Sequence, residues 1–369
     1  MKLPYAEDLN TGYLARLFDN TSECYKLFWF KAIVTAVGDG KLTLTYEELI
    51  DKMIADAWYM VTEYHLNLGP RDTLQSVIEL MNSRNPELKS SVKESVIIDY
   101  LAGIEDKEII AMKRTLTLNV PYRLQAPFLS DIKGKAWNIR TSDLADKINQ
   151  GKRLIYYFEA INGLDSRIVI NEDWAEYIRK NREILLGWIE YHMIHYLQKR
   201  NPSVPGIADK LYPPQARKLE KVKNYWKLLL SVEPIQEIYN DQILNDKDIS
   251  IDHFVPWSYV AHDEFWNLSP TTKGINSSKS NSLPNWDMYF PKLARLEYRS
   301  YKLIWKYENI HNEFAKCAKE HINNADIQER LYSKGLSYDG FAERLKTVIY
   351  PVYNAAHDCG FDWNWEYKD

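Results

Sequence analysis

The first 120 residues show apolar side chains on broad faces with a helical repeat. Such faces predict helices that bury themselves against one another as a bundle. The clearest runs are "CYKLFWFKAIVTAV" (24–37), "LIDKMIADAWYMVTEY" (49–64) and "LQSVIELMN" (74–82).

Each of these runs follows a pair of residues typical of a capping box, in which an N-terminal side chain and one three residues later satisfy free backbone N–H groups. The pairs are Asn20 with Glu23, Thr45 with Glu48, and Asp72 with Gln75. Glycines at 38 and 40 predict the end of the first helix.

The middle of the chain changes character. Two prolines make residues 119–129 irregular, which places a domain boundary near residue 120. Residues 153–171 read as two strands around an Asn162–Gly163 turn. Asn171 then caps a long helix over 172–200, in which His192 and His195 are expected to be structural rather than zinc ligands.

After a linker at 202–214, a basic helix is predicted over 215–232, and further helices over 287–322 and 338–353. The predicted fold is mainly α with small β elements. Its four parts are a helical N-terminal domain (1–120), a middle region with a hairpin (121–244), a small ββα unit (245–291) and C-terminal helices (292–369).

The ββα unit carries the chemistry. "DISID" (248–252) alternates polar and apolar residues as a half-buried strand does, and Pro256 ends it. "WNLSPT" (266–271) is the returning strand, and "KGINSSKSN" (273–281) forms a short helix before Pro284. The end of the first strand therefore lies beside the helix.

This arrangement lets Asp252 and Asn276 share one divalent cation, because oxygen ligands suit Mg²⁺ or Mn²⁺. Because histidine side chains in general titrate near neutral pH, His253 is the candidate general base for a water molecule. Asn267 is expected to bond backbone across the loop. Lys279, one helical turn beyond Asn276, is expected to meet a phosphate.

These residues resemble the HNH, or ββα-metal, nuclease module, most closely the cysteine-free version in CRISPR RNA-guided effector nucleases. The resemblance covers roughly residues 245–290, and it rests on Asp252-His253-x-Val255-Pro256, Asn267, Asn276 and Lys279 with "NSLP". It implies that His253 is the general base, Asp252 and Asn276 are metal ligands, and Asn267 holds the loop. The segments "ECYKLFWFKAIV" and "VPYR" also resemble parts of bacterial HNH proteins of restriction or defence type.

Composition limits the other possibilities. Over 369 residues the net charge is −4, so any nucleic-acid surface must be local. The three cysteines form no CxxC pair, which argues against a zinc knuckle and fits a reducing cytoplasm. No signal peptide or membrane span is expected. His262, Asp263 and Glu264 are expected in a solvated loop, with contact to the site left open.

The distribution of charge along the sequence indicates a candidate nucleic-acid surface. Residues 245–291 hold six acids and three lysines, whereas the helices on either side are basic. Cations on those helices are predicted to contact the phosphate backbone, with solvated helix faces as the alternative of nearly equal weight. The candidates are Lys218, Lys221, Lys223, Lys227, Arg295, Arg299 and Lys302.

The sequence thus predicts a metal-dependent endonuclease acting on nucleic acid, with double-stranded DNA as the favoured substrate. Two alternatives stay open: an RNase, and a binding or adaptor subunit whose module is silent or activated by a partner. A protein partner or a homodimer also stays open, and no membrane association is predicted.

Overall fold

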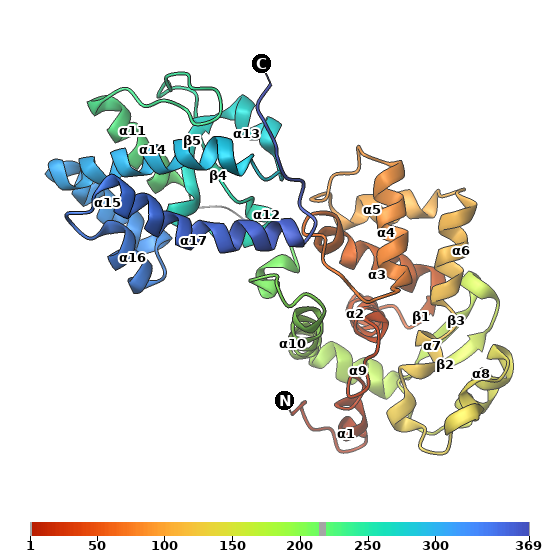
Figure 1. The fold of residues 1–369 in the computed structure, drawn as a ribbon. Helices are drawn as coiled ribbons and strands as arrows, with labels where there is room; N and C mark the ends of the chain where they lie inside the picture. Colours follow the sequence, from red (N-terminus) through yellow and green to blue (C-terminus); the bar gives the residue numbers. More distant parts are fainter. Residues whose placement is uncertain (1, 214–218, 369) are drawn as a thin grey trace. The chain divides into compact units, whose positions relative to one another are not determined.

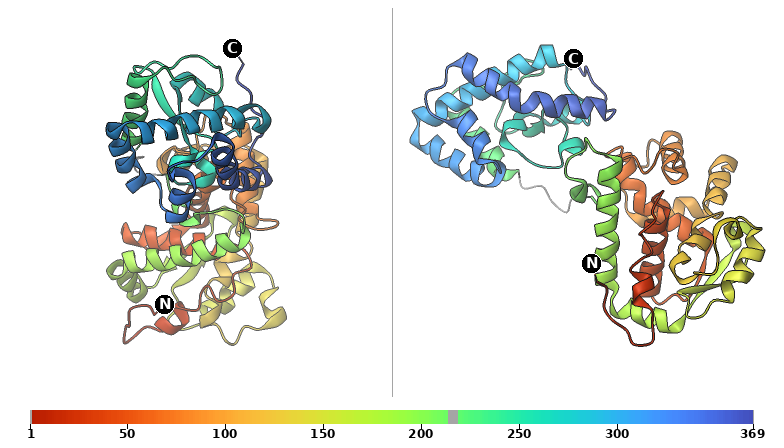
Figure 2. Two further views of the ribbon diagram at one scale, coloured as in Figure 1. Left: turned by 60° about the vertical axis from the view of Figure 1, so that its left-hand side comes forward. Right: turned by 60° about the horizontal axis from the view of Figure 1, so that its bottom comes forward.

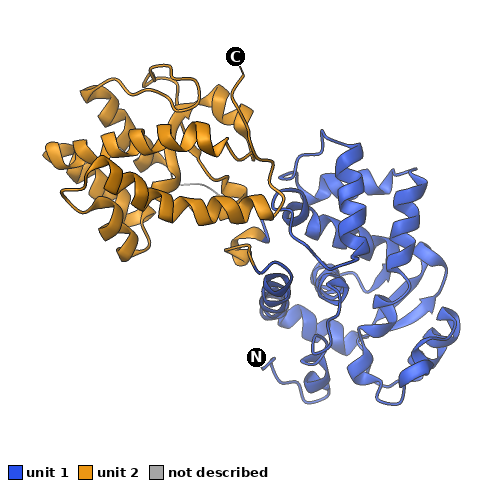
Figure 3. Cartoon of the chain, in the orientation of Figure 1, with its two compact units in different colours: residues 1–202, 211–213 blue, residues 203–210, 214–369 orange. Residues whose placement is uncertain are grey.

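The computed structural model describes residues 2–213 and 219–368. The chain divides into two compact units (Figure 3). Unit 1 comprises residues 1–202 and 211–213, and unit 2 comprises residues 203–210 and 214–369. Helices dominate both units and the strands are short, which confirms the predicted fold class. None of the helices in the described ranges is both long and apolar enough to cross a bilayer.

Unit 1 is a helical assembly with one small sheet at its side (Figure 1). Its elements are α1 (Thr11–Leu14), α2 (Tyr25–Gly38), β1 (Thr43–Thr45), α3 (Tyr46–Thr62), α4 (Thr73–Arg84), α5 (Glu94–Ala102), α6 (Lys107–Leu116), α7 (Val120–Arg123), α8 (Thr141–Asn149), β2 (Tyr156–Ala160), β3 (Arg167–Ile170), α9 (Glu172–Lys180) and α10 (Arg182–Arg200).

Helix α2 lies between α3 and α10, and large aromatic side chains fill the space among these helices. Two of the predicted caps are present: Thr45 and Glu48 form a reciprocal capping box, and the Asp72 carboxylate accepts from the Gln75 N–H. The predicted capping box of Asn20 and Glu23 is wrong. Helix α2 begins at Tyr25, and its N-cap is Cys24, a buried residue whose thiol donates to Asp72 instead.

The predicted hairpin is present as β2 and β3, but its sheet has a third strand that the sequence did not reveal. Strand β1 pairs with β3, so the order is β1-β3-β2, all antiparallel. Two further expectations need correction. The "VPYR" segment forms the short helix α7, because Pro121 sits in its first turn, where no N–H is needed. The long helix over 172–200 is broken at Asn181 into α9 and α10.

Unit 2 places a two-stranded hairpin among helices, and α14 and α17 run side by side (Figures 1 and 2). The expected helix over 287–322 is two helices, because Tyr307 is extended. The elements are α11 (Glu220–Val232), β4 (Ile249–His253), α12 (Trp257–Val260), β5 (Leu268–Thr272), α13 (Lys273–Lys279), α14 (Trp286–Lys306), α15 (Glu308–His321), α16 (Ala325–Tyr332) and α17 (Tyr338–Asp358).

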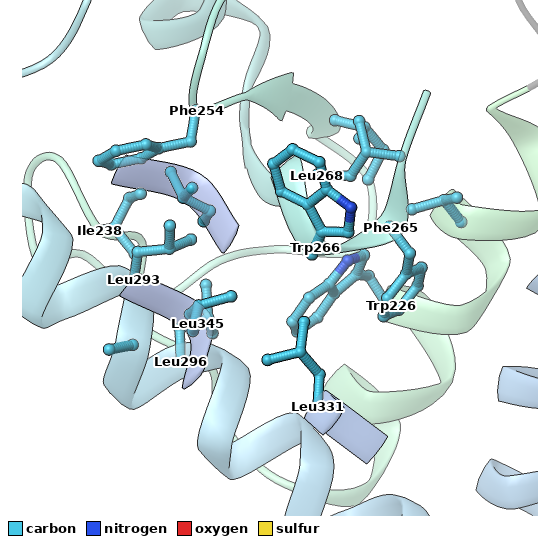
Figure 4. Packing of buried hydrophobic residues seen from close by; sticks show 14 of the residues in the cluster. Trp226, Ile238, Phe254, Phe265, Trp266, Leu268, Leu293, Leu296, Leu331 and Leu345 are labelled. Atoms are coloured by element: carbon cyan, nitrogen blue, oxygen red, sulfur yellow. The ribbon is translucent and has the colours of Figure 1, made fainter. Parts of the chain in front are cut away.

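The core of unit 2 joins the hairpin to these helices. Figure 4 shows Trp226 from α11 close to Phe265, in the short turn that leads to β5, with Leu331 from α16 beneath them. On the other side of the same cluster, Phe254 after β4 faces Leu293 from α14. The hairpin is therefore held by elements spread over the whole unit, and no cysteine pair is needed to brace it.

One ionisable side chain in the described part of this core, Glu297, lacks a hydrogen-bond partner. The Glu297 side chain on α14 is buried, and neither carboxyl oxygen has a hydrogen-bond partner in the described part of the chain. Burial raises the pKa of Glu297 well above its ordinary value, because the charged form loses its hydration. The group is therefore expected to keep its proton in the folded state.

We predict that Glu297→Gln gains stability over the parent as pH rises. The raised folded pKa means that the native state binds a proton which the unfolded chain loses above about pH 4.3. Below that pH the parent keeps the full contribution of Glu297 to its free energy of unfolding. Above it, the free energy of unfolding falls by up to about 1.4 kcal/mol per pH unit until the pKa of Glu297 in the folded state is reached. Urea unfolding from pH 4 to 8 measures this difference. The exposed-site control Glu343→Gln should track the parent, and a Glu297→Gln curve parallel to the parent would contradict the prediction.

Candidate active site

The site is built at the end of the β4–β5 hairpin where the loop joins the two strands. Asp252 lies opposite Ser269, and His253, the last residue of β4, lies opposite Leu268. Ile249 and Ile251 point into the core, so the alternation of the strand fixes the register and the position at which β4 ends. The predicted strand, loop, strand and helix are all present.

Asn267 closes the loop between the strands, as the sequence predicts. Its Oδ1 accepts from the Val255 N–H at 2.8 Å, and its Nδ2 donates to the Val255 carbonyl at 2.9 Å. The Phe254 N–H adds a bond to the Asn267 carbonyl at 2.9 Å. Because Asn267 is fully buried, these bonds set the direction in which the chain leaves His253.

Helix α13 presents two polar side chains to β4. Thr272 caps it by accepting from the Ile275 N–H. Asn276 donates through Nδ2 to the Ser250 hydroxyl at 3.0 Å and to the Ile251 carbonyl at 3.1 Å. Lys279 donates to the His253 carbonyl at 2.7 Å.

Asp252 is the centre of the polar contacts. Its Oδ1 accepts from Lys279 Nζ at 3.1 Å, and its Oδ2 accepts from the Tyr239 hydroxyl at 2.6 Å. All three side chains are buried, and Lys279 has no exposed surface. Burial lowers the pKa of Lys279, and the adjacent Asp252 opposes that shift. Burial next to Asp252 also raises the pKa of Tyr239 well above its ordinary value, so its phenol stays a donor.

The structure therefore places the Lys279 ammonium inside the module as the partner of Asp252, and contact with a phosphate stays a prediction. Sequence reasoning missed Tyr239. It lies thirteen residues before Asp252, outside the predicted ββα unit, and no spacing rule links the two.

The partner of His253 is a residue that the sequence pattern places in a solvated loop. Its Nε2 lies 2.8 Å from Asp263 Oδ1, and the exposed fractions of the His253 and Asp263 side chains are 5% and 20%. Asp263 follows α12 on the loop that leads to β5. Asp263 therefore has the contact with the site that the sequence left open, because the loop folds back over the end of β4.

The donor set fits a hard divalent cation. The hydrogen bonds of Asn276 orient its amide, so Oδ1 is the end that can act as a ligand. A carboxylate offers about four lone-pair positions, and Lys279 and Tyr239 use two of those on Asp252. Within residues 2–213 and 219–368, no group of three or more His, Cys, Asp and Glu side chains lies close enough together to hold a metal ion. Water molecules would complete the shell, as is usual for Mg²⁺.

Comparison with known families agrees with this geometry. Residues 236–285 match the family described as HNH endonuclease. Residues 236–285, here called the HNH module, are thus similar to an HNH endonuclease domain. The match begins at Gln236, so it includes Tyr239 as well as the hairpin and α13. No match to the chain was found among curated proteins or among solved structures.

The predicted nucleic-acid contacts lie on two helices around the HNH module. Lys218 lies outside the described residues. On α11, Lys221 pairs with Glu320, whereas Lys223 and Lys227 lie one turn apart and are partly exposed. On α14, Arg295, Arg299 and Lys302 are exposed, with Arg299 paired to Glu233.

The two helices are neighbours. The Tyr225 hydroxyl of α11 meets the Ser300 hydroxyl of α14 at 2.6 Å. A hollow of about 280 Å³ lies beside α14, where Lys292, Arg295 and Arg299 face the Gln236–Ile238 segment and Asp241. The basic side chains of α14 therefore share one hollow with residues 236–241, where the matched region begins.

We predict that Lys279→Met destabilises the protein by about 3–5 kcal/mol, because it leaves Asp252 as a buried carboxylate without its cation. The double variant Asp252→Asn/Lys279→Met should recover part of that loss, since it removes both charges. Urea unfolding of the parent and the variants at pH 7 measures the effect. Equal stability of the Lys279→Met variant and the parent would show that the pair is not the organising contact of the module.

Proposed function

We propose that this protein is a metal-dependent endonuclease that hydrolyses phosphodiester bonds, with double-stranded DNA as its substrate. The observation that carries the proposal is that Asp252 and His253 end strand β4 of a ββα module that matches the HNH endonuclease family, and that Asn276 on α13 bonds the same strand at Ser250 and Ile251. An acid, a base and an amide oxygen on adjoining elements are groups that hydrolysis of a phosphodiester can use.

Each residue of the proposed site has a separate role. His253 takes a proton from the water that attacks phosphorus. Asp252 and Asn276 hold Mg²⁺, or Mn²⁺ in its place, through oxygen atoms. When bound, the cation supplies positive charge for the phosphate oxygens and for the departing 3′-oxygen. Asn267 keeps the loop after His253 in place, and Lys279 and Tyr239 keep Asp252 in place.

The flanking helices support nucleic acid as the substrate. On α14, residues 292, 295, 299, 302 and 306 are all basic, and their spacing puts them along one helix face. Such a stripe can follow a phosphate backbone, whereas the acidic module repels phosphate until a cation binds. Lys223 and Lys227 add a second basic face on α11.

The biological setting is proposed from sequence resemblance alone. The module is similar to those of CRISPR effector nucleases, and two segments of unit 1 resemble bacterial proteins of restriction or defence type. A role in restriction or phage defence follows from that resemblance. Unit 1 would then supply target binding or a docking surface for a partner or a second copy of the chain.

We predict that the purified protein cleaves plasmid and linear DNA with Mg²⁺ and that EDTA abolishes the cleavage. His253→Ala should lose on the order of 10²–10⁴ in rate while binding of DNA persists, because only the proton acceptor is removed. His357→Ala, at a partly exposed histidine of α17, is the matched control. Cleavage of RNA but not of DNA would mean that RNA is the substrate. Parental rates for His253→Ala would remove this residue from the mechanism.

We predict that neutralising Lys223 and Lys227 weakens binding of unrelated DNA sequences to a similar degree, because phosphate contacts carry no sequence information. The plot of log affinity against log salt should flatten by roughly 0.9 for each phosphate that the protein no longer neutralises. Cleavage at saturating DNA should stay close to the parental rate. Binding measured across a salt series tests this, with the double variant Lys93→Gln/Lys107→Gln at two exposed lysines of unit 1 as the charge-matched control. An unchanged slope would mean that this face of α11 is only solvated.

A further inference from the structure

We infer that Asp263 is a positioning residue for His253, an inference that rests on the proposed role of His253 as general base. The Asp263 carboxylate lies 2.8 Å from His253 Nε2, and the His253 side chain is almost fully buried at this contact. The contact joins the end of β4 to the loop after α12. Asp263 acts through His253 and does not contact the reacting atoms.

The chemical consequence concerns the two ring nitrogens. A carboxylate accepts hydrogen bonds, so the contact favours the tautomer of His253 with its hydrogen on Nε2. In that tautomer Nδ1 carries the lone pair that accepts a proton. The contact also limits rotation of the ring, which keeps the proton-accepting nitrogen aimed in one direction.

The position of Asp263 is itself fixed by the C-terminal helices. Its backbone carbonyl accepts from His321 Nδ1 at 2.8 Å, at the end of α15. The adjacent Glu264 is buried, and its Oε1 accepts from the Asn323 side chain at 2.7 Å. Two neighbouring residues of the loop are thus bound to the same end of α15. A carboxylate held in this way can orient a ring, whereas one on a mobile loop would not.

A general electrostatic effect of the Asp263 charge can be separated from a positioning effect by comparing the activities of two variants. Asp248, at the start of the same hairpin, is exposed and carries the same charge as Asp263. Removal of either carboxylate changes the net charge of the module equally. Only removal of Asp263 takes away the partner of His253. Asp248→Ala is therefore the matched control for Asp263→Ala.

The kinetic test compares the parent with Asp263→Ala, Asp263→Glu and Asp248→Ala on linear DNA with Mg²⁺. We expect Asp263→Ala to lose on the order of 10–100-fold in kcat with KM and DNA affinity unchanged, as is typical when an orienting partner is removed. Asp263→Glu should recover part of the rate, because it restores the carboxylate. Asp248→Ala should match the parent. A parental kcat for Asp263→Ala would overturn the inference.

A spectroscopic test does not depend on cleavage. In protein labelled with ¹⁵N-histidine, the His253 signals are identified by their disappearance in His253→Ala. We expect the Nε2–H tautomer in the parent and a mixture of tautomers in Asp263→Ala. The same tautomer in both proteins would overturn the inference, even with the nuclease assignment intact. Full activity of His253→Ala, in contrast, would overturn the proposed mechanism while the tautomer result still reports on the contact.

Discussion

The buried ion pair between Asp252 and Lys279 is the contact on which the site depends. It joins β4 to α13, and the Tyr239 hydroxyl joins the segment before the hairpin to the same carboxylate. Because an unpaired buried charge is costly, the three segments are expected to be ordered together. The same lysine bonds the His253 carbonyl, so one ammonium group fixes the Asp252 side chain and the backbone of the adjacent His253.

This arrangement explains how a hairpin without cysteines can hold a site. Helices α11, α14, α15 and α17 pack around the hairpin and form its core. Helices α11 and α14 also carry basic residues, whereas the module carries an excess of acids. These two helices thus serve two purposes: they brace the hairpin, and they supply the positive charge that the module lacks. The end of α15 also holds the loop that brings Asp263 to His253.

Local patterns in the sequence predicted the local parts of this structure. Alternation, proline positions and spacing were enough for β4, β5 and α13, and for the bonds of Asn267 across the loop. They were not enough for contacts decided by packing. Tyr239 and Asp263 reach the site through the path of the chain in space, and the three-residue strand β1 is too short to show alternation. The cap expected at Asn20 failed because burial of Cys24 decided where α2 begins.

The proposed mechanism requires that Asp252 and Asn276 hold one cation beside His253. Anomalous diffraction from crystals grown with Mn²⁺ can locate that ion independently of any activity. We expect one strong peak at roughly 2.1 Å from an Asp252 carboxylate oxygen and from Asn276 Oδ1, the distance typical of hard cations such as Mg²⁺. A peak elsewhere, with none between these two residues, would refute the proposed cation site.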